Sequence, residues 1–110
     1  MPTPHRPSIA VQRALRKLGH DLHDARRRRG LPAGVVADRA FTSRPSLHRI
    51  ERGDASVSIG IYAAVLQALG FLDRLTELAD PGTDATGLAL DAEKLPRRVR
   101  LRRAPESRDA

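Results

Sequence analysis

The sequence contains no cysteine, so neither a disulfide bond nor a thiolate metal site can form. Tryptophan is absent and aromatic residues make up only 3% of the chain, which argues against a protein that stacks single-stranded nucleic acid on aromatic rings. No apolar run reaches the roughly 18–20 residues that span a bilayer. The first four residues, Met-Pro-Thr-Pro, lack the apolar core of a signal peptide. We therefore expect a cytoplasmic protein that binds no membrane.

Acidic residues are also in short supply. The chain has 13 Asp and Glu against 20 Lys and Arg, which gives a net charge of +7. Such an excess favours nucleic acid or another anionic surface as a partner, although small basic proteins that bind nothing specific share this composition. With 110 residues, the chain has room for one small domain with tails.

Catalytic and metal-binding motifs are missing as well. Serine, histidine and aspartate occur without a nucleophile elbow or a Gly-rich phosphate loop. His20 and His23 form an i, i+3 pair beside Asp21 and Asp24; two surface residues are the favoured interpretation, and a zinc site is the alternative. We expect no enzyme, no metal and no cofactor.

Apolar residues recur at helical spacing along most of the chain, and Ser and Gly punctuate the helices that this spacing predicts. Gly19 falls in the middle of the first helix and weakens it by about 1 kcal/mol relative to alanine. Tyr62 and Phe71 are expected in the core. The sequence thus predicts an all-α fold, with helices over residues 8–29, 31–40, 43–53, 58–70 and 71–79.

Breaker residues over 80–84 mark the end of this domain. We expect a disordered arm over 1–8, the helical domain over 9–80, and a short, partly disordered basic tail over 81–110. In the arm, His5 and Arg6 have the alternative of entering a minor groove. In the tail, residues 87–95 predict two helical turns before Pro96, and residues 97–103 alternate apolar residues with arginine as a strand does.

The third predicted helix has clear ends. Ser43 suits its N-cap, Pro45 its first turn, and Gly53 its left-handed stop. Leu47 and Ile50 form its inward side. Its outward side has no acidic residue, which indicates a polyanionic partner; this side carries Arg44, Ser46, His48 and Arg49.

Residues 43–53, Ser-Arg-Pro-Ser-Leu-His-Arg-Ile-Glu-Arg-Gly, resemble the recognition helix of Xre-type regulators, the group of phage repressors and Cro. The similarity runs from about Leu18 to Gly70. It implies a five-helix, lambda-repressor-like helix-turn-helix domain that binds double-stranded DNA. A domain this small reads few base pairs, so we expect a symmetric homodimer on a palindromic operator. The outward residues Arg44, Ser46, His48 and Arg49 would then face bases, with G·C pairs expected in each half-site. Candidates for phosphate contacts are Arg27, Arg28, Arg39, Ser43 and Arg52.

Several residues near this helix need separate interpretation. The arginine run over 26–29 fits phosphate contact and a solvated helix end equally well. By resemblance, Arg26 forms a structural salt bridge with Glu51. Ala33 stands where the family has a phosphate-binding glutamine. Phe41 stands where the family has glycine, and we expect its ring to plug the core from the turn.

The tail resembles the C-terminal part of HipB-like antitoxins, through Leu-Ala-Leu at 88–90, Leu-Pro at 95–96 and the arginine-rich run that follows. This resemblance implies a repressor of its own operon with a HipA-type kinase toxin as partner. The alternatives are a stand-alone repressor and a non-specific basic protein that coats DNA or RNA. Partner or dimer contacts would fall to Leu88, Leu95, Val99 and Leu101.

Overall fold

The computed structural model describes the backbone of residues 6–99 and the side chains of residues 6–94. Within residues 6–99 the secondary structure is entirely helical, without a strand, which confirms the all-α prediction. No helix in this range is long and apolar enough to cross a membrane. The chain divides into two compact units between Leu75 and Thr76. The elements are α1 (Ile9–Arg28), α2 (Ala33–Arg39), α3 (Arg44–Glu51), α4 (Ile59–Leu69), α5 (Leu72–Leu75), the 3₁₀ turn η1 (Pro81–Thr83) and α6 (Ala85–Val99).

The predicted helix ends are confirmed for the three best-defined helices. Ser8, Ser43 and Ser58 are the N-caps of α1, α3 and α4. Each hydroxyl accepts a hydrogen bond from the backbone N–H three residues later, at 3.2 to 3.3 Å. Gly53 and Gly70 follow α3 and α4 with φ of +77° and +88°, a conformation that glycine adopts without strain.

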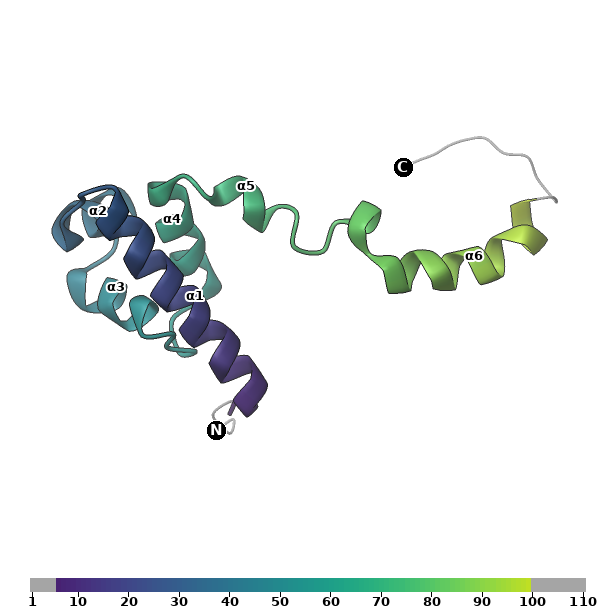
Figure 1. Cartoon of the computed structure of the whole chain (residues 1–110), viewed down its shortest axis with the longest axis horizontal. Helices are drawn as coiled ribbons and strands as arrows, with labels where there is room; N and C mark the ends of the chain where they lie inside the picture. The colour runs from purple at the N-terminus through teal and green to yellow at the C-terminus, as the bar shows by residue number, and fades with distance from the viewer. Residues whose placement is uncertain (1–5, 100–110) are drawn as a thin grey trace. The chain divides into compact units, whose positions relative to one another are not determined.

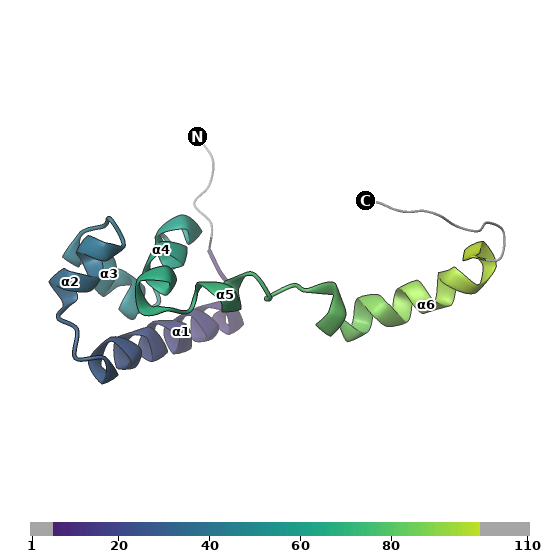
Figure 2. The same cartoon turned by 90° about the horizontal axis from the view of Figure 1, so that it is seen from above.

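The core of the first unit lies between α1 and a layer formed by α2, α3 and α4 (Figures 1 and 2). Each of these four helices contributes one apolar stripe. Tyr62 is buried as expected, and Phe71 packs against the core from its edge. The buried residues are Leu22, Ala25, Val36, Ala37, Ala40, Leu47, Ile50, Tyr62, Val65 and Leu69.

Two glycines allow α1 and the end of α3 to approach closely. A Cβ added at Gly19 would lie 2.7 Å from the carbonyl oxygen of Glu51 and would also clash with the carbonyl of Ile50. A Cβ added at Gly53 would lie 2.6 Å from the Cα of Arg16. Helix α1 runs without a break through Gly19. The close contact shows why glycine stands there: a larger residue would push α1 and α3 apart.

Two helix boundaries differ from the prediction. The second helix begins at Ala33, with Pro32 as its N-cap, rather than at Leu31. The fifth helix ends at Leu75 instead of Ala79, and Leu78 is exposed. Helices this short depend on packing for their stability, and the side chains of residues 76–79 are all exposed.

The prediction for the tail is wrong in two respects. Pro96 lies inside α6 rather than ending a helix, and residues 97–99 are helical rather than extended. Asp84 starts this helix, because its Oδ1 accepts a hydrogen bond from the Gly87 N–H at 2.9 Å. The sequence of α6 has a helical apolar pattern: Leu88, Ala92, Leu95 and Val99 follow one another at spacings of four, three and four residues. Leu101 lies outside the described residues.

Candidate nucleic-acid interface

A tight turn joins α2 to α3. The N–H of Thr42 donates to the carbonyl of Ala37 at 2.9 Å, and the N–H of Phe41 donates to the carbonyl of Asp38 at 3.1 Å. These two bonds satisfy carbonyl groups that the end of α2 would otherwise leave unpaired. The turn directs the chain into Ser43, the N-cap of α3. The result is a helix-turn-helix pair packed on α1.

Helix α3 is anchored in the core by two apolar side chains. Leu47 and Ile50 are fully buried, which fixes the orientation of the helix about its axis. Pro45 lies in the first turn, where its missing N–H breaks no helical hydrogen bond. Four residues of α3 are expected to face bases. Arg44, His48 and Arg49 are exposed, and Ser46 is half-buried.

These four side chains differ in how they are held. The Arg44 guanidinium lies over α2, where a Cβ added at Gly34 would be 2.6 Å from its Nη2. The hydroxyl of Ser46 accepts a hydrogen bond from Ser43 at 3.1 Å. Arg49 is exposed in the last turn of the helix. Among residues 6–94, neither Arg44 nor Arg49 forms an ion pair, so both guanidinium groups are available to an anionic ligand.

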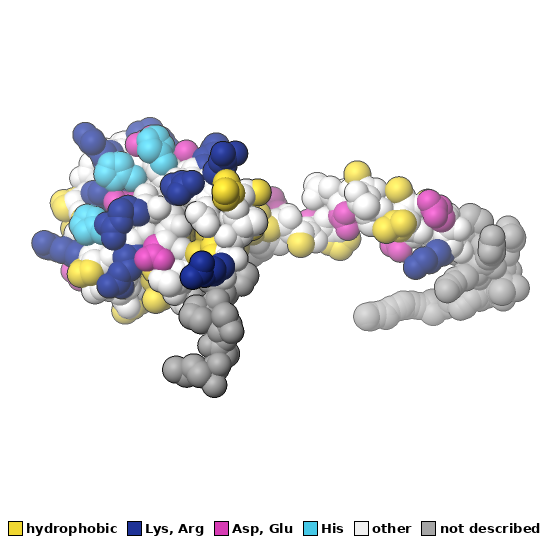
Figure 3. All heavy atoms as spheres, turned by 90° about the horizontal axis from the view of Figure 1, so that it is seen from below, with side chains coloured by type: hydrophobic (Ala, Val, Ile, Leu, Met, Phe, Trp, Pro, Cys, Tyr) yellow, Lys and Arg dark blue, Asp and Glu magenta, His cyan; other side chains and the backbone are white. Residues whose placement is uncertain are grey.

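The residues expected to contact phosphates lie at helix ends. The four arginines of this set are exposed, while the Ser43 hydroxyl is engaged in the cap of α3. Figure 3 shows Lys, Arg and His side chains gathered over one face of the first unit. Among the phosphate candidates, Arg27 and Arg28 lie at the end of α1 and Arg39 at the end of α2. Ser43 and Arg52 lie at the two ends of α3.

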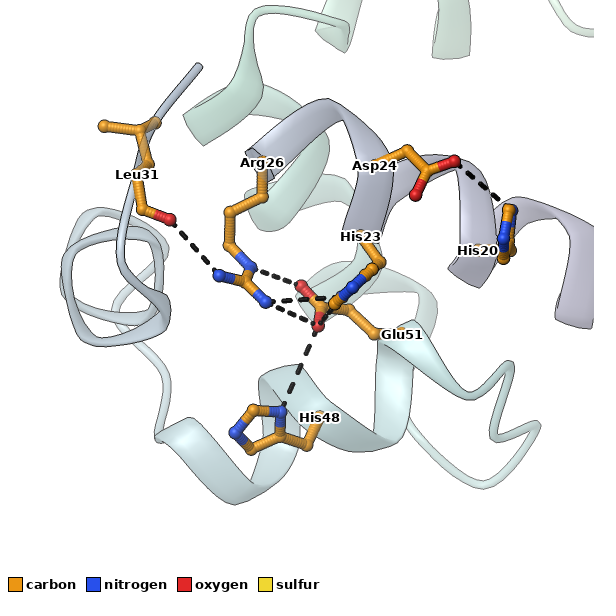
Figure 4. A network of polar contacts seen from close by, with 7 residues as sticks. All are labelled: His20, His23, Asp24, Arg26, Leu31, His48 and Glu51. Atoms are coloured by element: carbon orange, nitrogen blue, oxygen red, sulfur yellow. Dashed lines mark hydrogen bonds and ion pairs between the residues drawn. The ribbon is translucent and has the colours of Figure 1, made fainter. Parts of the chain in front are cut away.

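The structure brings Arg26 and Glu51 together between α1 and α3 (Figure 4). Arg26 Nε lies 2.7 Å from Glu51 Oε2, and Nη2 lies 3.1 Å from Oε1, so the contact is bidentate. Arg26 Nη1 also donates to the carbonyl of Leu31 at 3.2 Å. The side chains of Arg26 and Glu51 are only 12% and 7% exposed. Arg26 therefore links α1, the α1–α2 loop and α3 through one guanidinium group.

Two histidines join this network, and only one was expected in the site. His23 Nδ1 lies 3.0 Å from Glu51 Oε1, which corrects its interpretation as a plain surface residue. Its spacing of three from Arg26 on one helix face was the available signal. His48 Nδ1 lies 4.0 Å from the same oxygen, so its ring is held near Glu51 as well as facing solvent. No group of three or more potential metal ligands occurs in the described residues.

The charge state of Glu51 follows from these contacts. Burial acts to raise the pKa of Glu51, but hydrogen bonds from Arg26 and His23 outweigh it and place the pKa below its ordinary value. The same pairing raises the pKa of Arg26. Glu51 is therefore ionised at neutral pH, and its charge is neutralised inside the domain rather than presented on the surface.

The four arginines at the end of α1 divide into two that contact other residues of the domain and two that are exposed. Arg26 points to Glu51, and Arg29 lies over the ring of Phe71 at 4.9 Å. Arg27 and Arg28 lie between them in sequence and are exposed. Arg74 covers Phe71 at 4.8 Å, so this ring lies within cation–π distance of two guanidinium groups. The run is therefore partly structural and partly exposed.

The prediction that Phe41 plugs the core is wrong. Its side chain is 96% exposed, and its backbone has a φ of +54°. This left-handed conformation turns the chain sharply at the end of α2 and directs the side chain outward. The core is closed at this end by Ala40 instead, which is 4% exposed.

Comparison with known proteins agrees with this geometry. A family model described as a helix-turn-helix domain matches residues 17–79, more than half of the chain. This range covers most of α1 and all of α2 to α5. No curated protein and no solved structure matches the chain. Helix-turn-helix domains are typical of DNA-binding regulators. The protein belongs to the helix-turn-helix domain family.

Proposed function

We propose that the protein is a sequence-specific transcriptional repressor that inserts α3 into the major groove of DNA. One observation carries this proposal. Glu51, the single acidic residue of α3, is held inward by Arg26. The side of α3 that faces solvent is therefore free of negative charge, as a surface that approaches phosphates requires.

Two classes of contact follow from the positions of the side chains. Residues that project from α3 would read base edges, through Arg44, Ser46, His48 and Arg49. Residues at the surrounding helix ends would position the domain on phosphates, through Arg27, Arg28, Arg39, Ser43 and Arg52. A domain of this size reads few base pairs, so a homodimer on a palindromic operator completes the proposal.

The tail, residues 81–110, suggests a more specific role. In this role the protein is the antitoxin of a HipA-type toxin–antitoxin operon and represses that operon. Helix α6 is amphipathic, yet the described part of its unit offers no second long helix to cover it. A helix of 15 residues is only marginally stable alone. Docking on the toxin or on a second copy of the chain would cover its apolar stripe, which consists of Leu88, Leu95 and Val99 and continues in sequence to Leu101.

The DNA-binding part is tested by selecting duplexes from a random library with the full-length protein. We expect one palindromic sequence with G·C pairs in each half-site. Arg49→Ala should then weaken binding to that duplex by about 1–3 kcal/mol and relax the preference at one base pair. The matched control is Arg52→Ala, which should weaken selected and random duplexes alike.

Two outcomes would contradict these assignments. Equal loss on both duplexes for Arg49→Ala would show that Arg49 contacts phosphate rather than a base. Recovery of no preferred sequence, with binding that random competitor DNA abolishes, would favour the non-specific basic protein.

The role of the tail is tested by ending the chain at Asp80. The first unit ends before this residue, so we expect its helicity and operator preference to persist. Dimerisation or toxin binding should be lost, and affinity for all DNA should fall with a shallower salt dependence. An adjacent HipA-like gene whose product binds only the full-length chain would support the antitoxin. A dimer that survives truncation, with no such gene nearby, would favour a stand-alone repressor.

A further inference from the structure

Phe41 adopts a backbone conformation that its side chain disfavours. Its φ of +54° lies in the left-handed region, at the residue that follows the C-cap of α2. The hydrogen bonds from Phe41 and Thr42 to the last turn of α2 fix this conformation. Glycine is the usual residue at such a position, because a Cβ there approaches the neighbouring carbonyl oxygen.

The ring itself adds nothing to the fold. Phe41 is 96% exposed, so the described part of the chain leaves almost its whole side chain in water. Phe71 shows the contrast, because its ring packs against the core and lies under two guanidinium groups. Glycine or asparagine at position 41 would remove both the backbone strain and the exposed apolar surface. A residue that is unfavourable in both respects indicates a contact made outside the folded chain.

The surroundings of Phe41 identify the kind of partner. The residue stands two positions before Ser43, the N-cap of α3, where the helix dipole is positive. The exposed side chains of Arg39 and Arg44 flank it in sequence, one on each side. A polyanion that also offers apolar surface fits this combination, and duplex DNA is such a ligand through its deoxyribose rings and thymine methyl groups.

We propose that Phe41 is a DNA-contacting residue whose ring packs on deoxyribose or on a thymine methyl group at the edge of the groove that receives α3. This inference rests on the proposed DNA-binding function. The contact supplies apolar burial beside the arginines, which supply charge. Because the ring displaces no counterion, its contribution to affinity does not depend on salt.

The first test uses Phe41→Trp in the full-length chain, whose natural sequence contains no tryptophan. The probe is a labelled duplex recovered by selection with the unmodified protein. Anisotropy of the label reports whether DNA binds, and indole emission with acrylamide quenching reports whether position 41 is covered. We expect protection of the indole on binding. Ile9→Trp, at a residue that is 63% exposed near the start of α1, serves as the control and should stay accessible.

The second test separates the ring from the fold. Phe41→Asn introduces a residue that tolerates the left-handed conformation better than phenylalanine does, so thermal stability should be unchanged or raised. Affinity for the duplex should fall roughly ten- to a hundredfold, with the same salt dependence as the unmodified protein. Phe41→Tyr should restore most of the affinity. Replacing thymine by uracil in the duplex identifies the contact, since only a methyl contact is weakened by this change.

Distinct results would overturn the inference. If the duplex binds while the indole introduced at position 41 stays open to quencher, the side chain there does not contact DNA although the proposed function stands. If Phe41→Asn binds DNA as tightly as the unmodified protein, or instead lowers the mass of a dimer in sedimentation, position 41 serves another purpose. If no duplex binds the unmodified protein, both the proposed function and this inference fail.

Discussion

Replacing Gly19 by alanine should destabilise the protein, although helix propensity alone predicts the opposite. Alanine inside a helix is favoured over glycine by about 1 kcal/mol. In this structure, however, the added methyl carbon would lie 2.7 Å from the Glu51 carbonyl oxygen and 2.8 Å from its carbonyl carbon. Both atoms belong to the backbone, so relief requires α1 and α3 to move apart.

The magnitude follows from the two opposing effects. Overpacking of a tight contact costs about 1–3 kcal/mol, and the upper part of this range applies because the obstructing atoms are backbone. After the gain in helix propensity, Gly19→Ala should lower the free energy of unfolding by about 1–2 kcal/mol. For a domain of this size, the midpoint of thermal unfolding should fall by roughly 4–16 °C.

Urea and thermal denaturation of the full-length chain, followed by circular dichroism, would measure this effect. The matched control is Gly60→Ala in α4, where the nearest atom to the added carbon is the Ser58 Oγ at 3.8 Å. That variant should be as stable as the unmodified protein or more so by up to about 1 kcal/mol. A Gly19→Ala protein that gains stability as Gly60→Ala does would refute the close approach of α1 and α3.

Three further predictions concern the ion pair and the base-reading face. Because the pKa of Glu51 is lowered in the folded state, its stabilising effect is present at neutral pH and is lost as the pH falls through the folded-state pKa. Glu51→Gln should thus lower the unfolding free energy by about 2 kcal/mol at neutral pH and by less in acid, measured by urea denaturation across pH. A double-mutant cycle with Arg26→Ala should show coupling above about 0.5 kcal/mol; additive effects would remove the ion pair from the account. Gly34→Ala should leave stability within about 0.5 kcal/mol yet weaken binding to the selected duplex, because the added carbon displaces the Arg44 guanidinium; unchanged affinity would exclude Arg44 from base contact.

The helices of the first unit could be predicted from sequence because local signals agree with the global fold. Ser43 and Gly53 mark both ends of α3, and the period of Leu47 and Ile50 gives its buried side. Such signals depend on neighbours within one or two turns, which a sequence displays directly.

The features that the sequence did not reveal depend on residues far apart in the chain. His23 lies 28 positions from Glu51, and its spacing of three from Arg26 is a weak local signal that does not show the contact with Glu51. For Gly19 the sequence shows only a low helix propensity, because the backbone atoms that require a glycine there belong to α3. A bulky residue in place of the glycine of the similar family predicts a core plug at Phe41, whereas the turn geometry directs its side chain outward.

The tail shows a different difficulty, because two periodicities compete in it. Val99 and Leu101 alternate with arginine as in a strand, but Leu88, Ala92 and Val99 share one side of a helix. The alternating stretch is shorter than the helical one, and the Asp84 cap starts α6 well before it. A longer pattern with a defined start was the better guide here.

The hydroxyl of Tyr62 donates to the carbonyl of Asp54 at 2.8 Å and so fastens the loop that follows α3 to helix α4. This residue is the chain's single tyrosine, and the chain has no tryptophan, so its near-ultraviolet absorbance and emission come almost entirely from this one ring. Burial, with the negative charge of Asp54, raises the pKa of the phenol, so an alkaline absorbance titration lies at higher pH in the folded protein than in the unfolded one. The unlabelled protein therefore carries its own optical probe at the junction between α3 and the rest of the bundle. Opening of that junction on heating or on addition of DNA can be followed without altering a single residue.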